Sequence, residues 1–252
     1  MRRFLFALLL AALSHVAFAS FSVLPPGSQN TEGDGFNRAL TMSVGQSRRY
    51  QWVVDSSAVG PIAVGDQITG ISFRADIQSQ NPATWPPTNA TFSSFVLSIG
   101  SAATTAATAS TVFANNRSGV QSTVYSGSYT IPQDSYLNNG GTGPNPWGPE
   151  LVFQTPFTYS GGNLCFEFVH SGTDIATSLA HDAVTDNASS GVRAIGGNSS
   201  GATAGNITSF TVSRLSYTSV PEPSTVWAVL FGGSLVAGGT IRSRRIRAVM
   251  SK

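Results

Sequence analysis

The chain has 252 residues, with 14 basic and 12 acidic side chains and one cysteine, Cys165. A lone cysteine excludes an intramolecular disulfide and a thiolate metal cluster. The basic residues cluster at the two ends, so that residues 20–219 hold seven arginines, no lysine and eleven acids, a net charge of −4. We therefore expect no nucleic-acid partner, because the body lacks the basic surface that such binding needs.

The N-terminus has the parts of a secretory signal peptide. Two arginines precede an apolar run over residues 4–13, which is too short to span a bilayer comfortably. Ala17 and Ala19 then supply the small residues at positions −3 and −1 of a signal peptidase site. We expect residues 1–19 to be removed by signal peptidase, which leaves Ser20 as the first residue of the mature chain.

The body shows a hydrophobic period of two, typical of strands with one buried face. Segments rich in Pro, Gly and Asn separate these runs and indicate turns. Many short strands with such punctuation predict an all-β fold, a single jelly-roll-like β-sandwich over residues 20–219. Strands are expected at residues 50–54, 71–77, 95–99, 151–153, 164–168 and 209–217.

Two segments of the body depart from simple alternation. The apolar residues of 209–217 move from one face of the strand to the other, so we expect a β-bulge near Ser213 and Arg214. Residues 102–110 mix alanine, which favours helix, with threonine, which favours extended structure. We expect this segment to be a loop or a strand edge.

Possible metal ligands are densest late in the body. Asp174, Asp182 and Asp186 could bind calcium together with backbone carbonyls, and His170 and His181 lie nearby in the sequence. Their spacing matches neither an EF-hand loop nor a His-Glu-x-x-His motif. We expect solvated loop side chains and no cofactor, with calcium at the three aspartates as the alternative.

The chain shows no evident catalytic constellation. A serine hydrolase would need a nucleophile and an acid beside His170 or His181. Glu150 and Glu167 could be imagined as a glycosidase pair. Glu167, however, alternates with apolar residues on an expected strand, so its side chain should face solvent or an opposite arginine. We expect no enzymatic activity.

Two tryptophans suggest a binding role instead. Trp85 and Trp147 each lie in a segment rich in proline or glycine, where exposed indole rings could stack on sugars. The other interpretation is that both rings fold back over the ends of the core. Exposure would favour a carbohydrate-binding module for envelope polysaccharide or exopolysaccharide.

The C-terminus contains three parts in a fixed order. First come Val220, Pro221, Glu222, Pro223 and Ser224, next seventeen uncharged residues at 225–241, and finally a basic cluster at Arg242, Arg244, Arg245 and Arg247. As a helix the uncharged run would measure about 25 Å, near the lower limit for crossing a bilayer. We expect a transmembrane helix at about 225–241 with the arginines in the cytoplasm and the body outside the membrane.

This order of parts resembles the PEP-CTERM sorting tail of exported bacterial proteins, here residues 220–252. The resemblance implies a Gram-negative-type cell, an inner-membrane-tethered precursor, and an exosortase that cuts near Pro-Glu-Pro. The body also resembles the sandwich domains often found before such tails, at residues 49–51, 68–74, 155–159, 162–164, 170–172 and 182–184. We expect a non-enzymatic protein of the cell surface or extracellular matrix, with a carbohydrate-binding module as the alternative.

Overall fold

The computed structural model describes residues 19–77, 81–141, 143–185 and 188–220. The chain divides into a body, Phe18–Ser219, and a second unit made of the two ends. The described residues form β-strands and short 3-10 helices, and no helix among them is long and apolar enough to cross a membrane. The expected signal peptide and the expected span at 225–241 lie outside the described residues, apart from Ala19.

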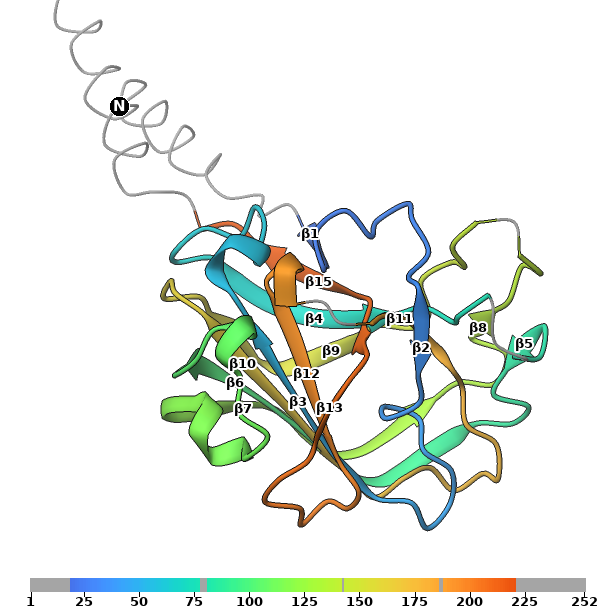
Figure 1. Ribbon diagram of the computed structural model, residues 1–252. Helices are drawn as coiled ribbons and strands as arrows, with labels where there is room; N and C mark the ends of the chain where they lie inside the picture. Colours follow the sequence, from blue (N-terminus) through green and yellow to red (C-terminus); the bar gives the residue numbers. More distant parts are fainter. Residues whose placement is uncertain (1–18, 78–80, 142, 186–187, 221–252) are drawn as a thin grey trace, which may run out of the picture. The chain divides into compact units, whose positions relative to one another are not determined.

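Two larger antiparallel sheets make up most of the body (Figure 1). The four-stranded sheet has the order β1 (Ala19–Leu24), β15 (Ser213–Thr218), β4 (Gln67–Phe73) and β9 (Leu151–Thr158). The six-stranded sheet has the order β13 (Asn206–Thr208), β12 (Val192–Gly197), β3 (Arg48–Val54), β10 (Leu164–His170), β6 (Ala90–Ala102) and β7 (Arg117–Ile131). Every segment that alternation predicted as a strand overlaps at least one strand of these two sheets or of the two smaller sheets described next.

Two small sheets complete the body. One joins β14 (Phe210–Thr211), β11 (His181–Val184) and β2 (Gly35–Asn37), and the other joins β5 (Thr84–Trp85) with β8 (Tyr136–Leu137). Figure 1 shows β5 and β8 together at one end of the body. The short 3-10 helices are η1 (Ser56–Ala58), η2 (Ala106–Thr108), η3 (Phe113–Asn116) and η4 (Ala188–Ser190).

The main core lies between the two larger sheets. Trp52 of β3 is fully buried at its centre, with its ring 6.1 Å from that of Phe73 on β4 and 4.7 Å from that of Phe168 on β10. Such edge-on aromatic packing contributes beyond the apolar area that it buries. Two sheets that meet through their inward side chains are consistent with a β-sandwich.

The outer face of the six-stranded sheet is covered as well. Val53 of β3, Ile195 of β12 and Phe113 of η3 form a second, smaller apolar cluster. Cys165 of β10 lies directly opposite Val53 of β3 and is fully buried. It points away from the main core, as its place between Leu164 and Phe166 in the alternating pattern predicts. Burial raises the pKa of its thiol to about 12, which keeps the thiol neutral and unreactive.

One local prediction is confirmed and another is wrong in position. Residues 102–110 follow the end of β6 as a loop that contains η2, which the Thr105 hydroxyl caps by accepting a hydrogen bond from the Thr108 N–H. The phase change in 209–217 arises because the chain leaves the small sheet after β14 and joins the four-stranded sheet at β15. The bulge of β15 against β4 lies between Ser216 and Tyr217 and not at Ser213.

Candidate functional site

Asp182, a calcium candidate, is fully buried in an ion pair with Arg74. Its carboxylate accepts hydrogen bonds from Arg74 Nε at 2.7 Å and from the Gly33 N–H at 2.8 Å. Arg74 also donates to the Thr31 carbonyl at 2.6 Å. Both carboxylate oxygens are occupied, so Asp182 anchors the segment before β2 to β4 and β11.

Asp174, a second calcium candidate, is used elsewhere in the fold. Asp174 is exposed, and its Oδ1 accepts the Thr91 N–H at 2.7 Å, which ties the loop after β10 to β6. Asp186 lies outside the described residues. Among the residues that the structure describes, no group of three or more His, Cys, Asp or Glu side chains could hold a metal ion.

Both histidines of the body are buried among aromatic rings. The Nδ1 atom of His170 accepts the Gly172 N–H at 3.0 Å, so Nε2 carries the proton toward the Ala39 carbonyl at 2.6 Å. Burial lowers the pKa of His170 to about 4 and that of His181 to about 3. Neutral, enclosed imidazoles of this kind are core side chains and are poorly placed as general bases for a substrate in solvent.

Glu167 faces arginine, as its position on the strand predicts. Its Oε1 lies 2.9 Å from Arg49 Nη2 and 3.6 Å from Arg117 Nη1, and its Oε2 accepts a hydrogen bond from Gln51 Nε2 at 2.9 Å. Glu167 is 8% exposed, and Glu150 is exposed. The carboxylate of Glu167 is thus committed to a polar layer beside η3 and is not held open for an acid–base role.

A Gly-x-Ser-x-Gly pattern does occur at residues 197–201. In α/β-hydrolases that pattern forms a sharp turn between a strand and a helix, which exposes the serine nucleophile. Here it falls at the end of β12 and in the turn that leads back to β13. The pattern therefore belongs to a β-hairpin and does not form a nucleophile elbow.

The tryptophans differ from the exposed pair that their loops suggest. Trp85 is 1% exposed, because its pairing with Tyr136 in the β5–β8 ribbon directs the indole inward. Its Nε1 donates to Thr177 Oγ1 at 3.3 Å. Trp147 is half-buried, with the guanidiniums of Arg74 and Arg214 at 5.1 and 5.3 Å from its ring centroid. Burial of Trp85 agrees with the second interpretation and removes it as a sugar-binding candidate, and Trp147 is engaged by two cations.

An open groove of about 330 Å³ lies where β2 meets the hairpin of β12 and β13. Asn37 of β2 forms its floor: its Nδ2 donates to the Ser209 carbonyl at 2.7 Å, and its Oδ1 accepts the Ala39 N–H at 2.6 Å. The two arms of the hairpin approach each other closely at Gly205, where no side chain would fit. A Cβ there would lie 2.4 Å from the Gly196 carbonyl oxygen.

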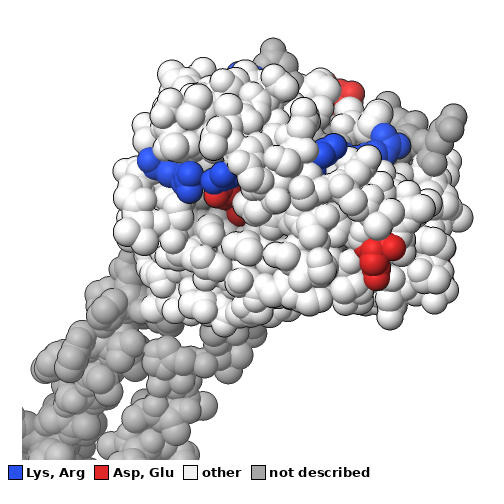
Figure 2. Space-filling model, turned by 90° about the horizontal axis from the view of Figure 1, so that it is seen from below, with Lys and Arg blue, Asp and Glu red and all other residues white. Residues whose placement is uncertain are grey.

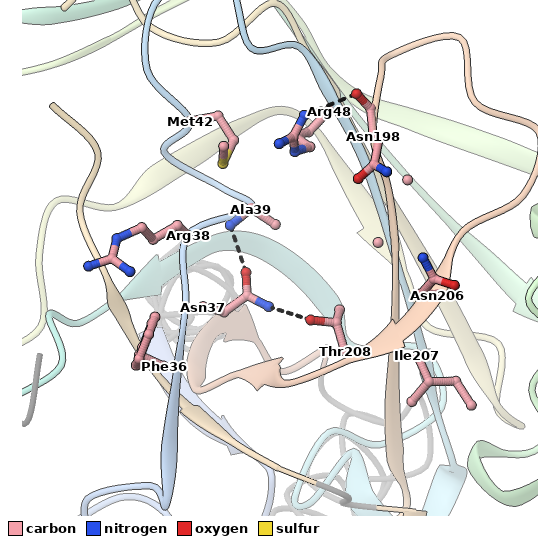
Figure 3. Close-up of a pocket in the computed structure, with 12 residues that line it drawn as sticks. Phe36, Asn37, Arg38, Ala39, Met42, Arg48, Asn198, Asn206, Ile207 and Thr208 are labelled. Carbon is pink, nitrogen blue, oxygen red and sulfur yellow. Dashed lines mark hydrogen bonds between the residues drawn. The ribbon is translucent and has the colours of Figure 1, made fainter. Parts of the chain in front are cut away.

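The walls of the groove combine cationic, amide and apolar groups. Figure 3 shows the Asn37 side chain reaching from β2 to Thr208 of the hairpin, beside Asn206 and Ile207, whereas the side chains of Phe36 and Arg38 leave β2 on its other side. Arg48 enters from the start of β3, where its Nη1 donates to the Asn198 carbonyl at 3.0 Å. These residues come from segments about 160 positions apart, and the sequence contains no motif that links them.

No protein-family model matches the chain, and no curated protein or solved structure is significantly similar to it.

Proposed function

We propose that this chain is an exported, non-enzymatic protein of the cell surface or extracellular matrix, processed at both ends. Signal peptidase would cut after Ala19, and an exosortase of a Gram-negative-type cell would cut near residues 221–223. The segment at 225–241 would hold the precursor in the inner membrane until the second cut. The sequence of both ends motivates this proposal, and the geometry of β1 and β15 supports it.

That geometry is the pairing of the first and last long strands of the body. β1 and β15 are antiparallel neighbours, and Ala19 is the register partner of Thr218. Paired residues in adjacent antiparallel strands have Cα atoms about 4.5–5.5 Å apart. The expected signal peptidase site therefore lies beside Thr218. Thr218 comes two positions before Val220, where the expected sorting motif begins. In the folded body, the two expected processing sites therefore flank neighbouring strands of one sheet.

The absence of enzymatic activity is supported by how the polar groups of the body are used. Asp182, Glu167 and His170 all satisfy structural partners within the described residues. A catalytic acid, base or nucleophile must instead be within reach of a bound substrate.

We extend the proposal to the topology of the body, which we propose to be a jelly roll. The strand orders β1-β15-β4-β9 and β3-β10-β6-β7 are those of a jelly roll, with β12 and β13 added at one edge.

The sorting proposal is tested with a reporter fused to Val220–Lys252. In a host with its exosortase, the reporter should be shortened and moved beyond the inner membrane, and deletion of the exosortase should leave it full-length and membrane-bound. A matched fusion with alanine at residues 221–223 should behave like the deletion. Unchanged size and location after the deletion would refute exosortase processing.

Polysaccharide binding by the body is a second candidate function. It no longer rests on Trp85, because that ring is buried. The groove between β2 and the β12–β13 hairpin favours it instead, since the amide of Asn206 and the hydroxyl of Thr208 line it and an exposed aromatic side chain, Phe36, lies at its edge. A glycan array probed with the full chain and with a Phe36→Ala variant tests this function, and no signal for any glycan would contradict it.

A further inference from the structure

Two pairs in the chain place an aspartate or an asparagine directly before a glycine: Asp34 precedes Gly35, and Asn139 precedes Gly140. In such a pair the backbone nitrogen of the glycine can attack the side-chain carbonyl carbon and close a five-membered imide. Glycine permits this closure best, because it has no Cβ to block the approach. The sequence does not distinguish the two pairs, but their surroundings in the structure do.

Asp34 is held back from this reaction by Thr185. Its Oδ1 accepts the Thr185 N–H at 2.6 Å, and its Oδ2 accepts the Thr185 hydroxyl at 2.7 Å. These hydrogen bonds lower the pKa of the carboxyl group, and an ionised carboxylate is a poor electrophile. Thr185 also packs on Gly35, where a Cβ would lie 2.8 Å from its Cγ2. Both the carboxyl group and the glycine are therefore fixed in place.

Asn139 and Gly140 have the opposite surroundings. Both are exposed in the loop that follows β8, and a Cβ at Gly140 would meet nothing within 4 Å. The Gly140 N–H donates to Asn138 Oδ1 at 3.3 Å, which is longer than an ordinary N–H···O bond. Within the described residues, Asn139 is bonded through its backbone N–H, to Asn145 Oδ1 at 2.7 Å, and not through its side chain.

We propose that Asn139 is a site of spontaneous covalent modification by this reaction. The Gly140 nitrogen loses its proton to hydroxide and bonds to Asn139 Cγ, and the Cγ–Nδ2 bond breaks as ammonia leaves with a proton from water. Water then opens the imide at Cγ, which gives aspartate, or at the backbone carbonyl carbon, which gives isoaspartate. The net reaction consumes one water molecule and releases one ammonia. This inference is independent of the export route and of any ligand in the groove.

The isoaspartate product would loosen the loop after β8, because the main chain then runs through Cγ and gains a methylene group. The loop is fixed at Asn145, which is 3% exposed and whose Nδ2 donates to the Ala75 carbonyl at 3.0 Å. It is also fixed at Asn138, whose Nδ2 donates to the Asn81 carbonyl at 3.1 Å. A longer main chain between these two anchors cannot keep the hydrogen bond of Asn139 to Asn145 in its present geometry.

The test is peptide mapping by mass spectrometry of the full chain, purified in detergent and incubated at mildly acidic and mildly alkaline pH. Asn139 should be converted at least about tenfold faster than Asn198, which is also exposed but precedes a serine. The rate should rise with pH, because the attacking nitrogen must lose its proton. Electron-transfer fragmentation distinguishes isoaspartate from aspartate.

A variant and an unfolded sample separate the chemistry from the fold. Gly140→Ala should slow the conversion of Asn139 by about tenfold or more, in the folded chain and in the chain unfolded in urea, because a Cβ hinders the attack. Asp34 should form isoaspartate in the unfolded chain and remain aspartate in the folded chain. Asn139 should react in both.

The loosening of the loop is measured by hydrogen exchange. The isoaspartate form should exchange the amides around Asn139 faster than the unmodified chain. Asn139→Asp is the matched control, since it carries the new charge without the longer main chain and should exchange like the wild type.

Four outcomes would overturn parts of the inference. An Asn139 that reacts in the unfolded chain and stays intact in the folded chain would mean that the loop protects it, and equal rates at Asn139 and Asn198 would remove the role of Gly140. Isoaspartate at Asp34 in the folded chain would contradict protection by Thr185. Unchanged hydrogen exchange in the isoaspartate form would contradict the loosening.

Discussion

At the scale of single residues, the buried pair of Arg74 and Asp182 shows how charge is used inside this body. The two side chains are 1% and 0% exposed, and the arginine also holds the Gln29 and Thr31 carbonyls. A buried charge that loses its partner carries the full cost of desolvation. One of the three aspartates that the sequence offered as calcium ligands is therefore a fold-determining residue.

Asp182→Asn should lower the free energy of unfolding by about 3–5 kcal/mol, because it leaves Arg74 buried without a counter-charge. Asp174→Asn is the matched control, since that side chain is exposed and its amide oxygen can still accept the Thr91 N–H. The control should change stability by about 0.5 kcal/mol or less. Urea denaturation measures both, and equal effects would contradict the assignment.

Trp85→Ala should destabilise the body by about 3–5 kcal/mol, because it empties a fully enclosed site against Tyr136. Trp147→Ala removes a half-buried ring of the same size and should cost less. Thermal or chemical unfolding of the two variants makes the comparison. A neutral Trp85→Ala would indicate that its indole is exposed after all.

The histidines give the body a defined response to acid. In the unfolded chain imidazoles titrate near pH 6.5, whereas burial lowers the pKa of His170 to about 4 and that of His181 to about 3. Between pH 6.5 and the lowered pKa values, the unfolded state binds more protons than the folded state. The stability that the two neutral histidines contribute is therefore present above pH 6.5 and is lost as the pH falls toward 4.

His181→Phe should reduce this acid sensitivity. The ring of His181 lies 5.5 Å from those of Phe73 and Tyr136, so phenylalanine suits its surroundings and cannot take up a proton. The free energy of unfolding, measured from pH 7 to pH 4, should fall less steeply in the variant than in the wild type. Parallel curves would exclude His181 as a source of the slope.

At the scale of elements, alternation predicted β3, β4, β6, β9, β10 and β15, because each has one face in an apolar core. The other four strands of the two large sheets, β1, β7, β12 and β13, were not predicted. Residues 164–168 became part of β10, with Phe166 and Phe168 in the main core. The short β2, β5, β8 and β11 escaped prediction, since they are two to four residues long and carry no measurable period. Their places depend on long-range pairings that local pattern does not contain.

The groove escaped prediction for the same reason. Its arginines, Arg38 and Arg48, flank an irregular segment, and its opposite wall comes from the β12–β13 hairpin. Likewise, the prolines after Trp85 left its exposure or burial open, while the pairing of β5 with β8 decides its burial. Residue chemistry was readable from the sequence, but the partners of each residue were not.

The pairing of β1 predicts an order of events during export. Ala19 and Ser20 lie within β1 opposite Thr218 and Tyr217, so a docked strand has one edge paired with β15 and is less accessible to a protease cleft, which binds the chain as an extended strand. We expect cleavage to precede the docking of β1. Signal peptidase should cut folded, purified precursor more slowly than precursor that has been unfolded in urea and freshly diluted into the cleavage reaction.

A control precursor with Leu24→Ala weakens the docking of β1, because Leu24 is fully buried at the end of that strand. Its folded form should be cut faster than the folded wild type. Equal cleavage of folded and unfolded wild-type precursor would show that β1 does not protect the site.

At the scale of the whole molecule, charge is divided between parts with different roles. The basic residues at the two ends account for the net charge of +2, and the body between them is mildly acidic. Even so, basic side chains form a broken row across one face of the body that is otherwise mostly uncharged (Figure 2). The body thus combines a low overall charge with local basic sites.

Mass spectrometry of the mature protein, with both termini identified, tests the central claim most directly. Processing at both ends predicts a chain that begins at Ser20 and ends near residues 221–223, without the basic cluster at Arg242, Arg244, Arg245 and Arg247. A mature chain that retains residues 1–19, or that still carries this basic cluster, would contradict the account.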